Sequence, residues 1–349
     1  MASRNEIEII IKADDKASGV IDGFVGKVGN VGSSLMRTGA AMTAATAPIA
    51  LALAAAVTSA MAFDSSMTNI GAVMGKSRTE MVSLNKAVLA IGKNSRAGPQ
   101  AAADAFYDIV GGVSDASAHM AILEASIKTA EAGSAELGST TNALVSVMNS
   151  YKFEADDAAY ASDVLTRTVG MGVGTMGDFA SALPSITGLA NSLKISFGDL
   201  ASQTAYLTTQ GNTAAQATTQ LSAMMTSMLN PNESMKKGLT ELGYASGQAA
   251  VEELGLVGAM NALKDTNAAN TDGMAKMLGS TEALRGVTAL AGPEFKTFTD
   301  NFTSGIEGAT TAAQAIQLDS PAAQFDLLKS KVAGLGIEVG QVLLPILVP

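Results

Sequence analysis

The Ala-rich, charge-free stretch from Thr38 to Phe63 constrains the fold of this chain more than any other feature. Its 26 residues are enough to cross a bilayer as a helix if they are apolar enough, and the other option is a helix buried in protein. About half of them are Ala, which is weak hydrophobicity for a membrane span. The large apolar residues that could contact a membrane or a partner include Ile49, Leu51, Leu53, Val57 and Met61.

The low aromatic content limits the kind of core that can form. Only 4% of the 349 residues are aromatic, none is Trp, and 47% are hydrophobic. Large rings normally fill much of a core, so Ala, Gly, Met and Leu must do most of the packing here. The composition therefore predicts close contact between helices rather than a thick core, in a chain long enough for two or three domains.

Charge and residue usage exclude several functional classes. The net charge is −10, with 22 Lys and Arg against 32 Asp and Glu, which argues against a surface that follows nucleic-acid phosphates. There is no Cys and only one His, His119, so a metal site built from Cys and His cannot be assembled. Acidic residues interrupt the N-terminal segment where a secretory signal would carry its apolar run. We therefore expect synthesis in the cytoplasm and no direct binding of nucleic acid.

The residue pattern predicts a mainly α protein with one short N-terminal β-strand. Alternation of Ile with charged residues in Glu6–Lys12 is typical of a strand. The next segment, Lys16–Arg37, spaces its apolar residues by four and three, which fits a coiled-coil seam and also an ordinary amphipathic helix packed on its own chain. After the apolar Ala-rich helix we expect a turn from Phe63 to Gly75 and then a series of helical hairpins.

Local signals predict where many of these helices start. Ser77 and Glu80 form a capping-box pattern ahead of a helix from Arg78 to Lys93. The segment after Gly308 is low in complexity and is not assigned to a helix. Further starts are predicted at Pro99, Asp115, Thr140 or Thr141, Asp156, Thr175, Ser196, Asn212 and Ser320.

These signals divide the chain into four parts. We expect an N-terminal strand and helix at 1–37, an apolar helix and turn at 38–75, and a core helical domain at 76–318. The start of a further helical region occupies 319–349. The apolar final residues predict that the natural protein continues beyond Pro349.

Three groups of residues could indicate chemistry, and each has a simpler structural interpretation. The stretch Gly172–Gly177 (GVGTMG) matches a dinucleotide-binding pattern with Asp199 about 20 residues on, but no strand precedes it, so a loop between helices is favoured. The pairs Asp156–Asp157 and Glu252–Glu253 fall near helix starts, where the helix dipole favours acids. We therefore predict no enzyme and no cofactor. A run of methionines could line an adaptable groove for a partner, but we predict that it belongs to the core; these residues are Met224, Met225 and Met228.

The segment from Ala62 to Val113 follows the Ala-rich helix with the pattern Phe-acid-x-x-Met, then an apolar-x-x-Val-x-Gly turn and a Ser-capped helix. In this order and spacing it resembles the core of phage tail tape measure proteins. Segments at Ala182–Leu200, Leu239–Gly243 and Leu278–Ala291 resemble later elements of that family, so the resemblance covers nearly the whole chain. The residues that occupy the motif positions are Phe63, Asp64, Met67, Ile70, Val73, Gly75, Ser77, Glu80 and Leu84.

The resemblance implies a structural virion protein rather than an enzyme. Such a protein sets tail length during assembly, occupies the lumen of the tail tube and is released into the host envelope when the genome is ejected. The implied partners are tail assembly chaperones, the tail tube protein and tail tip or baseplate proteins, with self-association and contact of the apolar helix with the host membrane as further expectations. A fully helical chain of 349 residues would reach about 520 Å.

Two readings from other classes compete with this one. In the first, the chain is a membrane-active pore-forming or toxin-like protein, and Thr38–Phe63 inserts into a bilayer. In the second, it is a helical signalling rod, but such rods sustain heptads for many turns, whereas the helices predicted here break repeatedly at Gly, Ser, Asn and Pro. The first is the stronger alternative.

Overall fold

The computed structural model describes residues 47–266 and 273–347. Over these residues it contains 17 helices and no strand, so the predicted mainly α fold is confirmed for this part of the chain. The strand predicted at Glu6–Lys12 and the helix predicted at Lys16–Arg37 lie outside the described residues.

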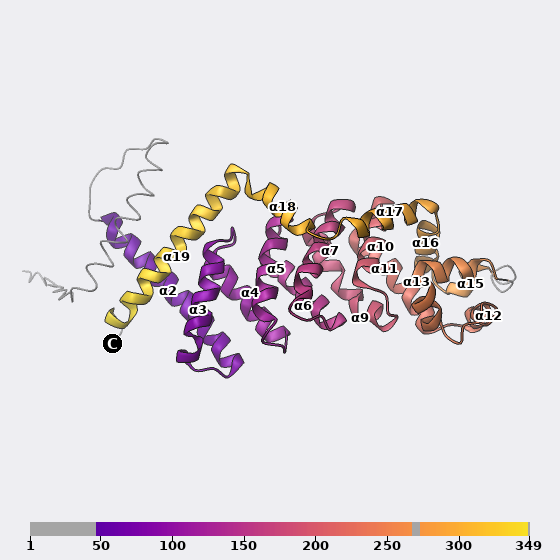
Figure 1. Ribbon diagram of the computed structural model, residues 1–349, viewed down its shortest axis with the longest axis horizontal. Coiled ribbons are helices and arrows are strands. Elements are labelled where there is room, and N and C mark those ends of the chain that lie inside the picture. The colour runs from indigo at the N-terminus through magenta and orange to yellow at the C-terminus, as the bar shows by residue number, and fades with distance from the viewer. Residues whose placement is uncertain (1–46, 267–272, 348–349) are drawn as a thin grey trace, which may run out of the picture.

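The greater part of the chain forms an elongated array of helices packed side by side, with α2 at one end and α12, α13 and α15 at the other (Figure 1). Every consecutive pair from α2 to α11 is in contact. The array consists of α2 (Ala47–Met74), α3 (Arg78–Lys93), α4 (Gly98–Gly112), α5 (His119–Ala132), α6 (Leu137–Tyr151), α7 (Asp157–Met171), α8 (Met176–Ala182), α9 (Pro184–Ser192), α10 (Phe197–Thr209), α11 (Ala214–Leu229), α12 (Glu233–Glu241), α13 (Gly247–Lys264) and α15 (Met274–Leu278).

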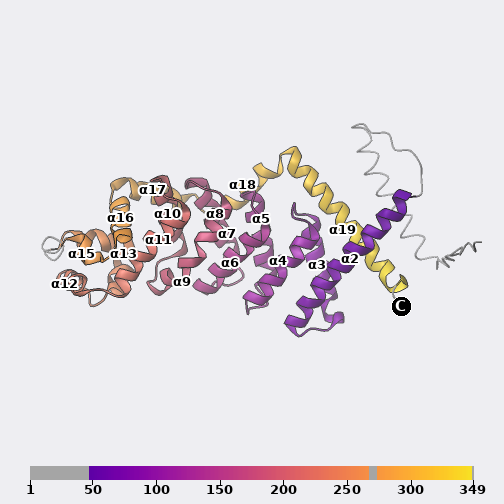
Figure 2. The same ribbon diagram turned by 180° about the vertical axis from the view of Figure 1, so that it is seen from behind.

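The last four helices run back along the array to its first helices, and we call them the return segment. They are α16 (Thr281–Leu290), α17 (Pro293–Ser304), α18 (Ala309–Leu318) and α19 (Pro321–Leu347). In order, α16 packs on α11, α17 on α10, α18 on α7 and α5, and α19 on α4, α3 and α2. Figure 2 shows the same path from behind, with α19 crossing α2. The segment expected to be only low in complexity forms α18, directly after Gly308 at φ 76°.

The apolar helix is longer than the sequence pattern predicts. The expected turn from Phe63 to Gly75 is wrong over most of its length, because α2 continues to Met74 and only then turns. Gly75 lies at φ 65°, a conformation that a residue with a Cβ rarely adopts, and this places the stop at one residue. The polar residues after Phe63 therefore belong to the same helix, whose exposed side chains become more polar from this point on.

Several predicted helix starts are confirmed in detail. At α3, Ser77 Oγ accepts the backbone N–H of Glu80, and a Glu80 carboxylate oxygen accepts the N–H of Ser77 at 2.8 Å. Thr175 and Asp178 form the same reciprocal pair ahead of α8. Each pair satisfies two N–H groups that a helix start leaves unbonded, so the local sequence alone fixes these starts.

The predicted start at Thr140 or Thr141 is wrong by one turn. The helix α6 begins at Leu137, because the Glu136 carboxylate accepts the N–H groups of Gly138 at 2.9 Å and Ser139 at 2.7 Å. These hydrogen bonds hold the pKa of Glu136 below its usual range, the bond from Ser139 being the larger cause. Glu is a less common cap than Thr, which explains why the sequence pattern misplaces this start.

Small and flexible side chains fill much of the space between helices, as the composition predicts. A Cβ added to Gly92 would lie 2.5 Å from the Cα of Pro99, so α3 and α4 can approach closely only because this residue is Gly. Burial of Met224, Met225 and Met228 confirms that they belong to the core. The fully buried aromatic residues are Phe63, Phe106, Phe179, Phe197 and Phe302.

Candidate functional site

The motif residues lie at the junction between α2 and α3. Asp64 on α2 accepts a hydrogen bond from the Arg78 guanidinium at 3.0 Å, which ties the start of α3 back to α2 across the Gly75 turn. Bonds from Ser77, first through its hydroxyl and then through its N–H, keep the pKa of Glu80 below its usual range. The capping carboxylate is therefore charged at neutral pH, and it holds the turn that sets the angle between the two helices.

The remaining motif residues face in two directions. Phe63 and Met67 are fully buried between α2 and the array, where they join the core formed with α4. Val73 is 52% exposed on the other side of the same helix. The motif thus combines core residues, a turn and an outward apolar residue, and it carries no group arranged for catalysis.

A groove runs along the outer side of this junction, between α2, α3 and the end of α19, and we call it the α2–α3 groove. Its volume is about 840 Å³. The side chains repeat at helical spacing on both walls, as Met61, Ser65 and Thr68 do on α2. Its lining residues are Met61, Asp64, Ser65, Thr68, Asn69, Arg78, Val82, Asn85, Lys86, Leu89, Gln341 and Leu344.

The predicted membrane or partner residues lie along α2. Met61 is 53% exposed at the rim of the groove, and Val57 is half-buried. Ile49, Leu51 and Leu53 belong to the first turns of α2, but their side chains lie outside the described part of the structure. In the described residues, every helix is either too short or too polar to span a bilayer.

The helix α19 covers part of α2 through residues without large side chains. A Cβ added to Gly340 would lie 2.5 Å from both the carbonyl oxygen of Ala56 and the Cβ of Ala60. The two helices therefore pack backbone against backbone at this point. An ion pair between Lys93 and Glu338 at 2.6 Å fixes α19 against α3 nearby.

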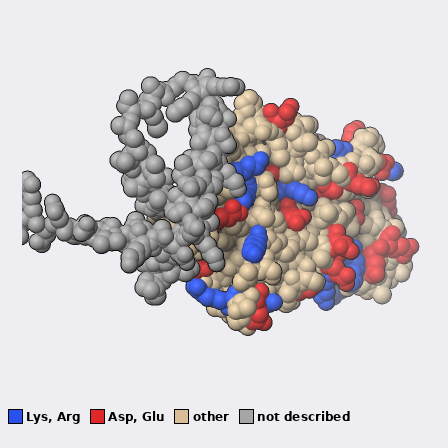
Figure 3. Space-filling view, turned by 60° about the vertical axis from the view of Figure 1, so that its left-hand side comes forward, with Lys and Arg blue, Asp and Glu red and all other residues tan. Residues whose placement is uncertain are grey.

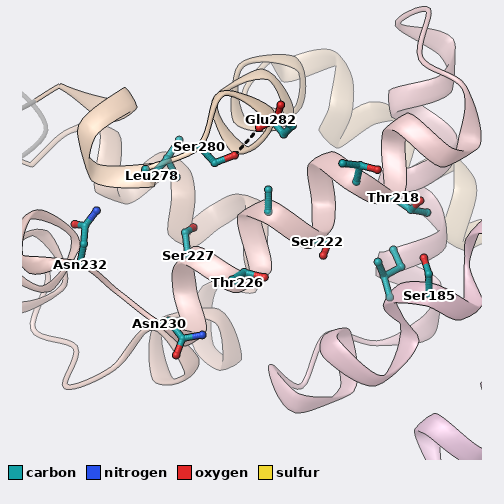
Figure 4. Close-up of a pocket in the computed structure, with 14 residues that line it drawn as sticks. Ser185, Thr218, Ser222, Thr226, Ser227, Asn230, Asn232, Leu278, Ser280 and Glu282 are labelled. Atoms are coloured by element: carbon teal, nitrogen blue, oxygen red, sulfur yellow. Dashed lines mark hydrogen bonds between the residues drawn. The ribbon is translucent and has the colours of Figure 1, made fainter.

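A second concave surface, the hydroxyl groove, lies between α9, α11 and the start of α16 (Figure 4). Its volume is about 690 Å³, and its walls are mostly Ser, Thr and Asn side chains. Thr218 donates to the carbonyl of Ala215 at 3.0 Å and Ser227 to that of Met224 at 2.7 Å, so these hydroxyl protons are already engaged. The labelled lining residues are Ser185, Thr218, Ser222, Thr226, Ser227, Asn230, Asn232, Leu278, Ser280 and Glu282.

The one acid of the hydroxyl groove is held in its charged form. The pKa of Glu282 is lowered, first by its own backbone N–H and then by the hydroxyl of Ser280, which donates at 2.9 Å. A carboxylate with a lowered pKa is a poor proton donor at neutral pH. The groove therefore offers hydroxyl and amide groups for polar contact, and none of its lining groups forms a pair suited to proton transfer.

The other residues considered for chemistry have structural roles. His119 is buried, and its Nε2 lies 2.7 Å from the carbonyl oxygen of Val113, where it closes the turn before α5. The first four residues of the GVGTMG stretch form a loop between α7 and α8, with Gly174 at φ 150°, and its last two residues, Met176 and Gly177, begin α8. Asp157 accepts the N–H of Glu154 at 2.9 Å at the start of α7. No group of three or more His, Asp or Glu side chains in the described residues could hold a metal ion.

Sequence reasoning missed a polar network that fastens α18 to the array. Asp163 on α7 accepts the N–H groups of Gly308 at 2.9 Å and Thr310 at 2.8 Å, which caps α18 from a distant part of the chain. The hydroxyl of Thr310 bonds to those of Ser162 and Thr166, both at 2.9 Å and all buried. The partners are more than 140 positions apart, so no local pattern links them.

A second part of this network is centred on a buried acid. Glu131 on α5 accepts the backbone N–H of Arg96 at 2.8 Å and the side-chain amide of Gln314 on α18. It lies in the last turn of α5, and an acidic side chain is ordinarily exposed. The tertiary contacts with the α3–α4 loop and with α18 make its burial possible, because both carboxylate oxygens receive a hydrogen bond.

Residues 85–292, which run from within α3 to just past α16, match the profile of a family described as phage-related minor tail protein. This match includes the hydroxyl groove and more than half of the chain. The chain belongs to this family. Membership in the phage-related minor tail protein family assigns the protein to the phage tail and so to the virion.

Two tape measure proteins are similar to this family member over most of its length. The probable tape measure protein of Clostridium phage phiCD119 is 24% identical over 290 residues, which are 79% of this chain and 31% of that protein. The tape measure protein of Pneumococcus phage Dp-1 is 22% identical over 325 residues, 91% of this chain and 28% of that protein. The resemblance to phage tail tape measure proteins is thus confirmed. The chain spans less than a third of the length of these relatives, and no solved structure matches it.

Proposed function

We propose that this chain is the N-terminal and core region of a tape measure protein that sets tail length during assembly. The similarity to two named tape measure proteins over 79% and 91% of the chain is the observation that carries the proposal. The proposed role is structural rather than enzymatic, since the α2–α3 groove and the hydroxyl groove are lined mainly by hydroxyl, amide and apolar side chains.

The way the helices are held together supports a role in which the chain changes its packing. In the proposal, the compact array is a stored form, and the protein occupies the tail-tube lumen in a more extended form. Many helices here are short, and some meet closely at Gly, as α3 and α4 do at Gly92, so single helices can leave the array without the whole core opening at once. The acidic net charge of −10 would keep the chain from binding the DNA that must follow it through the tube.

The proposed partners are the tail assembly chaperones, the tail tube protein and the tail tip or baseplate proteins. On ejection, release into the host envelope would bring the Ala-rich part of α2 to a membrane. A peptide covering Ala40–Phe63 tests this last step by vesicle binding. Partition into lipid is expected, and a peptide that stays in solution would remove membrane contact from the proposal.

Measuring tail length in phages with altered genes tests the ruler role. Deleting residues 175–194, which form α8 and α9, removes 20 residues, and the tail should shorten by about 30 Å if this region spans the lumen as a helix. Duplicating the same residues should lengthen it by the same amount. Electron microscopy of many tails resolves such differences in the mean.

The control replaces residues 175–194 with another helix-forming sequence of equal length. Since a ruler is read by its number of residues, the replacement should leave tail length unchanged while it changes every side chain. Tails of normal length in the deletion and the duplication would refute a ruler role for this part of the chain. A changed tail length in the replacement would show that specific side-chain contacts of this segment, and not its number of residues, set the tail length.

A further inference from the structure

The α2–α3 groove leaves apolar side chains exposed at the end of the array. In the interior, the face between two neighbouring helices is covered by the next helix, as α4 covers α2 and α3. Beyond α2 and α3 the described array ends, and Val82 is 49% exposed beside the exposed Met61 of the groove. On α19, Val342 is 44% exposed, and it directly follows the groove residue Gln341 in the sequence. An open end of a helical array with apolar residues is suited to receive one more helix.

The groove is cationic on its α3 side. Arg78 shares its charge with Asp64, while Lys86 has no ion-pair partner among the described residues. The side-chain oxygen of Asn85, between them on the same wall, is buried and accepts no hydrogen bond there. A helix that fits this groove would therefore present apolar residues to Met61 and Val82 and acidic residues to Lys86.

The opposite end of the array presents a helix with these properties. The first half of α13 exposes Glu252 and Glu253 together with Leu254, and Gly255 at φ 71° then interrupts the helix. Glu252 has no ion-pair partner among the described residues, and no Lys or Arg lies in this half of the helix. Figures 1 and 2 place α13 far from α2, at the other end of the molecule. We call this half of α13 the acidic turn.

The distribution of charge over the surface agrees with two unlike ends. On the face shown in Figure 3, Asp and Glu side chains predominate toward the end away from α2 and α19, while Lys and Arg side chains are more frequent near those helices. Groove-to-groove pairing would bring Lys86 of one copy near Lys86 of another, which is unfavourable. Pairing of unlike ends brings opposite charges together and leaves a free groove and a free acidic turn on the outer ends.

We propose that the acidic turn of one copy of this chain docks into the α2–α3 groove of a second copy, so that the arrays join end to end. Leu254 enters between Met61 and Val82, and Glu252 and Glu253 face Lys86 and Arg78. Because the two surfaces differ, the contact is heterologous and can repeat, giving open chains of copies rather than a closed dimer. The contact goes beyond the ruler role and does not depend on it, since it is a property of the isolated chain.

The test uses the full chain and two variants that each damage one end. Arg78→Glu with Lys86→Glu reverses the charge of the groove, and Glu252→Lys with Glu253→Lys reverses that of the acidic turn. In sedimentation, the unchanged chain should form species larger than 35.2 kDa as its concentration rises, and salt should weaken them. Each variant alone should lose about tenfold or more in association constant.

Mixing the two variants gives the decisive result. One variant keeps an intact acidic turn and the other an intact groove, so the mixture should recover the species larger than 35.2 kDa that each variant alone loses. A chain carrying all four substitutions has exchanged its charges and should associate again. Circular dichroism of each variant confirms that the helices are retained.

The matched control reverses two exposed cations that belong to neither docking surface, Lys128→Glu and Lys331→Glu, and should associate like the unchanged chain. An unchanged chain that stays at 35.2 kDa at every concentration would overturn the proposal. Association of the groove variant at full strength would also overturn it. Dimers formed by the acidic-turn variant alone would show groove-to-groove pairing and would overturn it as well.

Discussion

The helices α18 and α19 follow one another in the chain, and both pack on parts of the array that are distant in sequence. Different interactions hold each of them there. The helix α18 buries only Thr310 and leaves Ile316 75% exposed, and its fixed points are hydrogen bonds to Asp163, Ser162, Thr166 and Glu131. The helix α19 packs closely on α2 through Gly340, with an ion pair to Lys93.

The comparison separates interactions that determine where a helix lies from interactions that stabilise its contact with the array. A buried hydrogen bond contributes about 1 kcal/mol net, but a missing partner costs more, so the α18 network mainly determines where that helix lies. Close packing of the later part of α19 on α2 gains from many contacts at once and tolerates no added volume at Gly340. We therefore expect α19 to be sensitive to side-chain size and α18 to be sensitive to the loss of single polar atoms.

The largest effect should come from Gly340→Leu. Its side chain would collide with Ala56 and Ala60, so α19 must shift or leave α2, and we expect a loss of about 3 kcal/mol in the free energy of unfolding in urea. Gly336→Ala is the control on the same face, because its Cβ would meet Ala56 at an ordinary 3.7 Å and Ala favours a helix. Equal stability of the two variants would contradict the close packing of α19.

Thr310→Val should cost about 1–2 kcal/mol in the free energy of unfolding. The change keeps the shape of the side chain but leaves the buried hydroxyls of Ser162 and Thr166 without their shared partner. Thr311→Val, at the next and exposed position, should change stability by no more than about 0.5 kcal/mol. Chemical denaturation of both variants measures the difference, and a neutral Thr310→Val would mean that the hydroxyl network does not hold α18.

Asp163→Asn should loosen the start of α18 by about 1 kcal/mol. The amide keeps one acceptor oxygen but loses the charge and the second acceptor, so the N–H groups of Gly308 and Thr310 cannot both be bonded as before. Hydrogen exchange of these two amides should become faster, while exchange in α19 stays unchanged. Asp156→Asn, which removes an acid that makes no side-chain cap bond at the start of α7, is the control.

The smallest expected effect on the free energy of unfolding comes from the Glu136 cap at the start of α6, and it depends on pH. Bonds from Ser139 and Gly138 lower the pKa of Glu136 below its ordinary 4.5, so its contribution to stability is present above that pH and is lost as the pH falls through the lowered pKa. Glu136→Gln should therefore cost about 0.5–1 kcal/mol at pH 7. The difference from the unchanged protein should shrink below pH 4.5 in denaturation series. A difference that persists in acid would show that the cap does not depend on the charge.

Much of the secondary structure could be predicted because its causes are local. The starts at Ser77 and Thr175 follow from residues three positions apart, and the turn at Gly75 follows from one residue that can adopt positive φ. The start of α6 was misplaced because Glu136 competes with Thr140 and Thr141, and the pattern ranks Thr higher. The motif residues were found, but their division between core and surface was not, because α2 continues past Phe63.

Composition and local residue patterns are enough to predict short helices with small contact residues, an acidic net charge and a resemblance to tape measure proteins. Tertiary contacts are needed to show that the last four helices return along the array, that Asp163 caps α18, and that α2, α3 and α19 form a groove. The physical reason is distance along the chain. Caps and turns join residues a few positions apart, whereas the polar contacts that hold α18 and α19 join residues 140 to 250 positions apart, and these leave no periodic trace in the sequence.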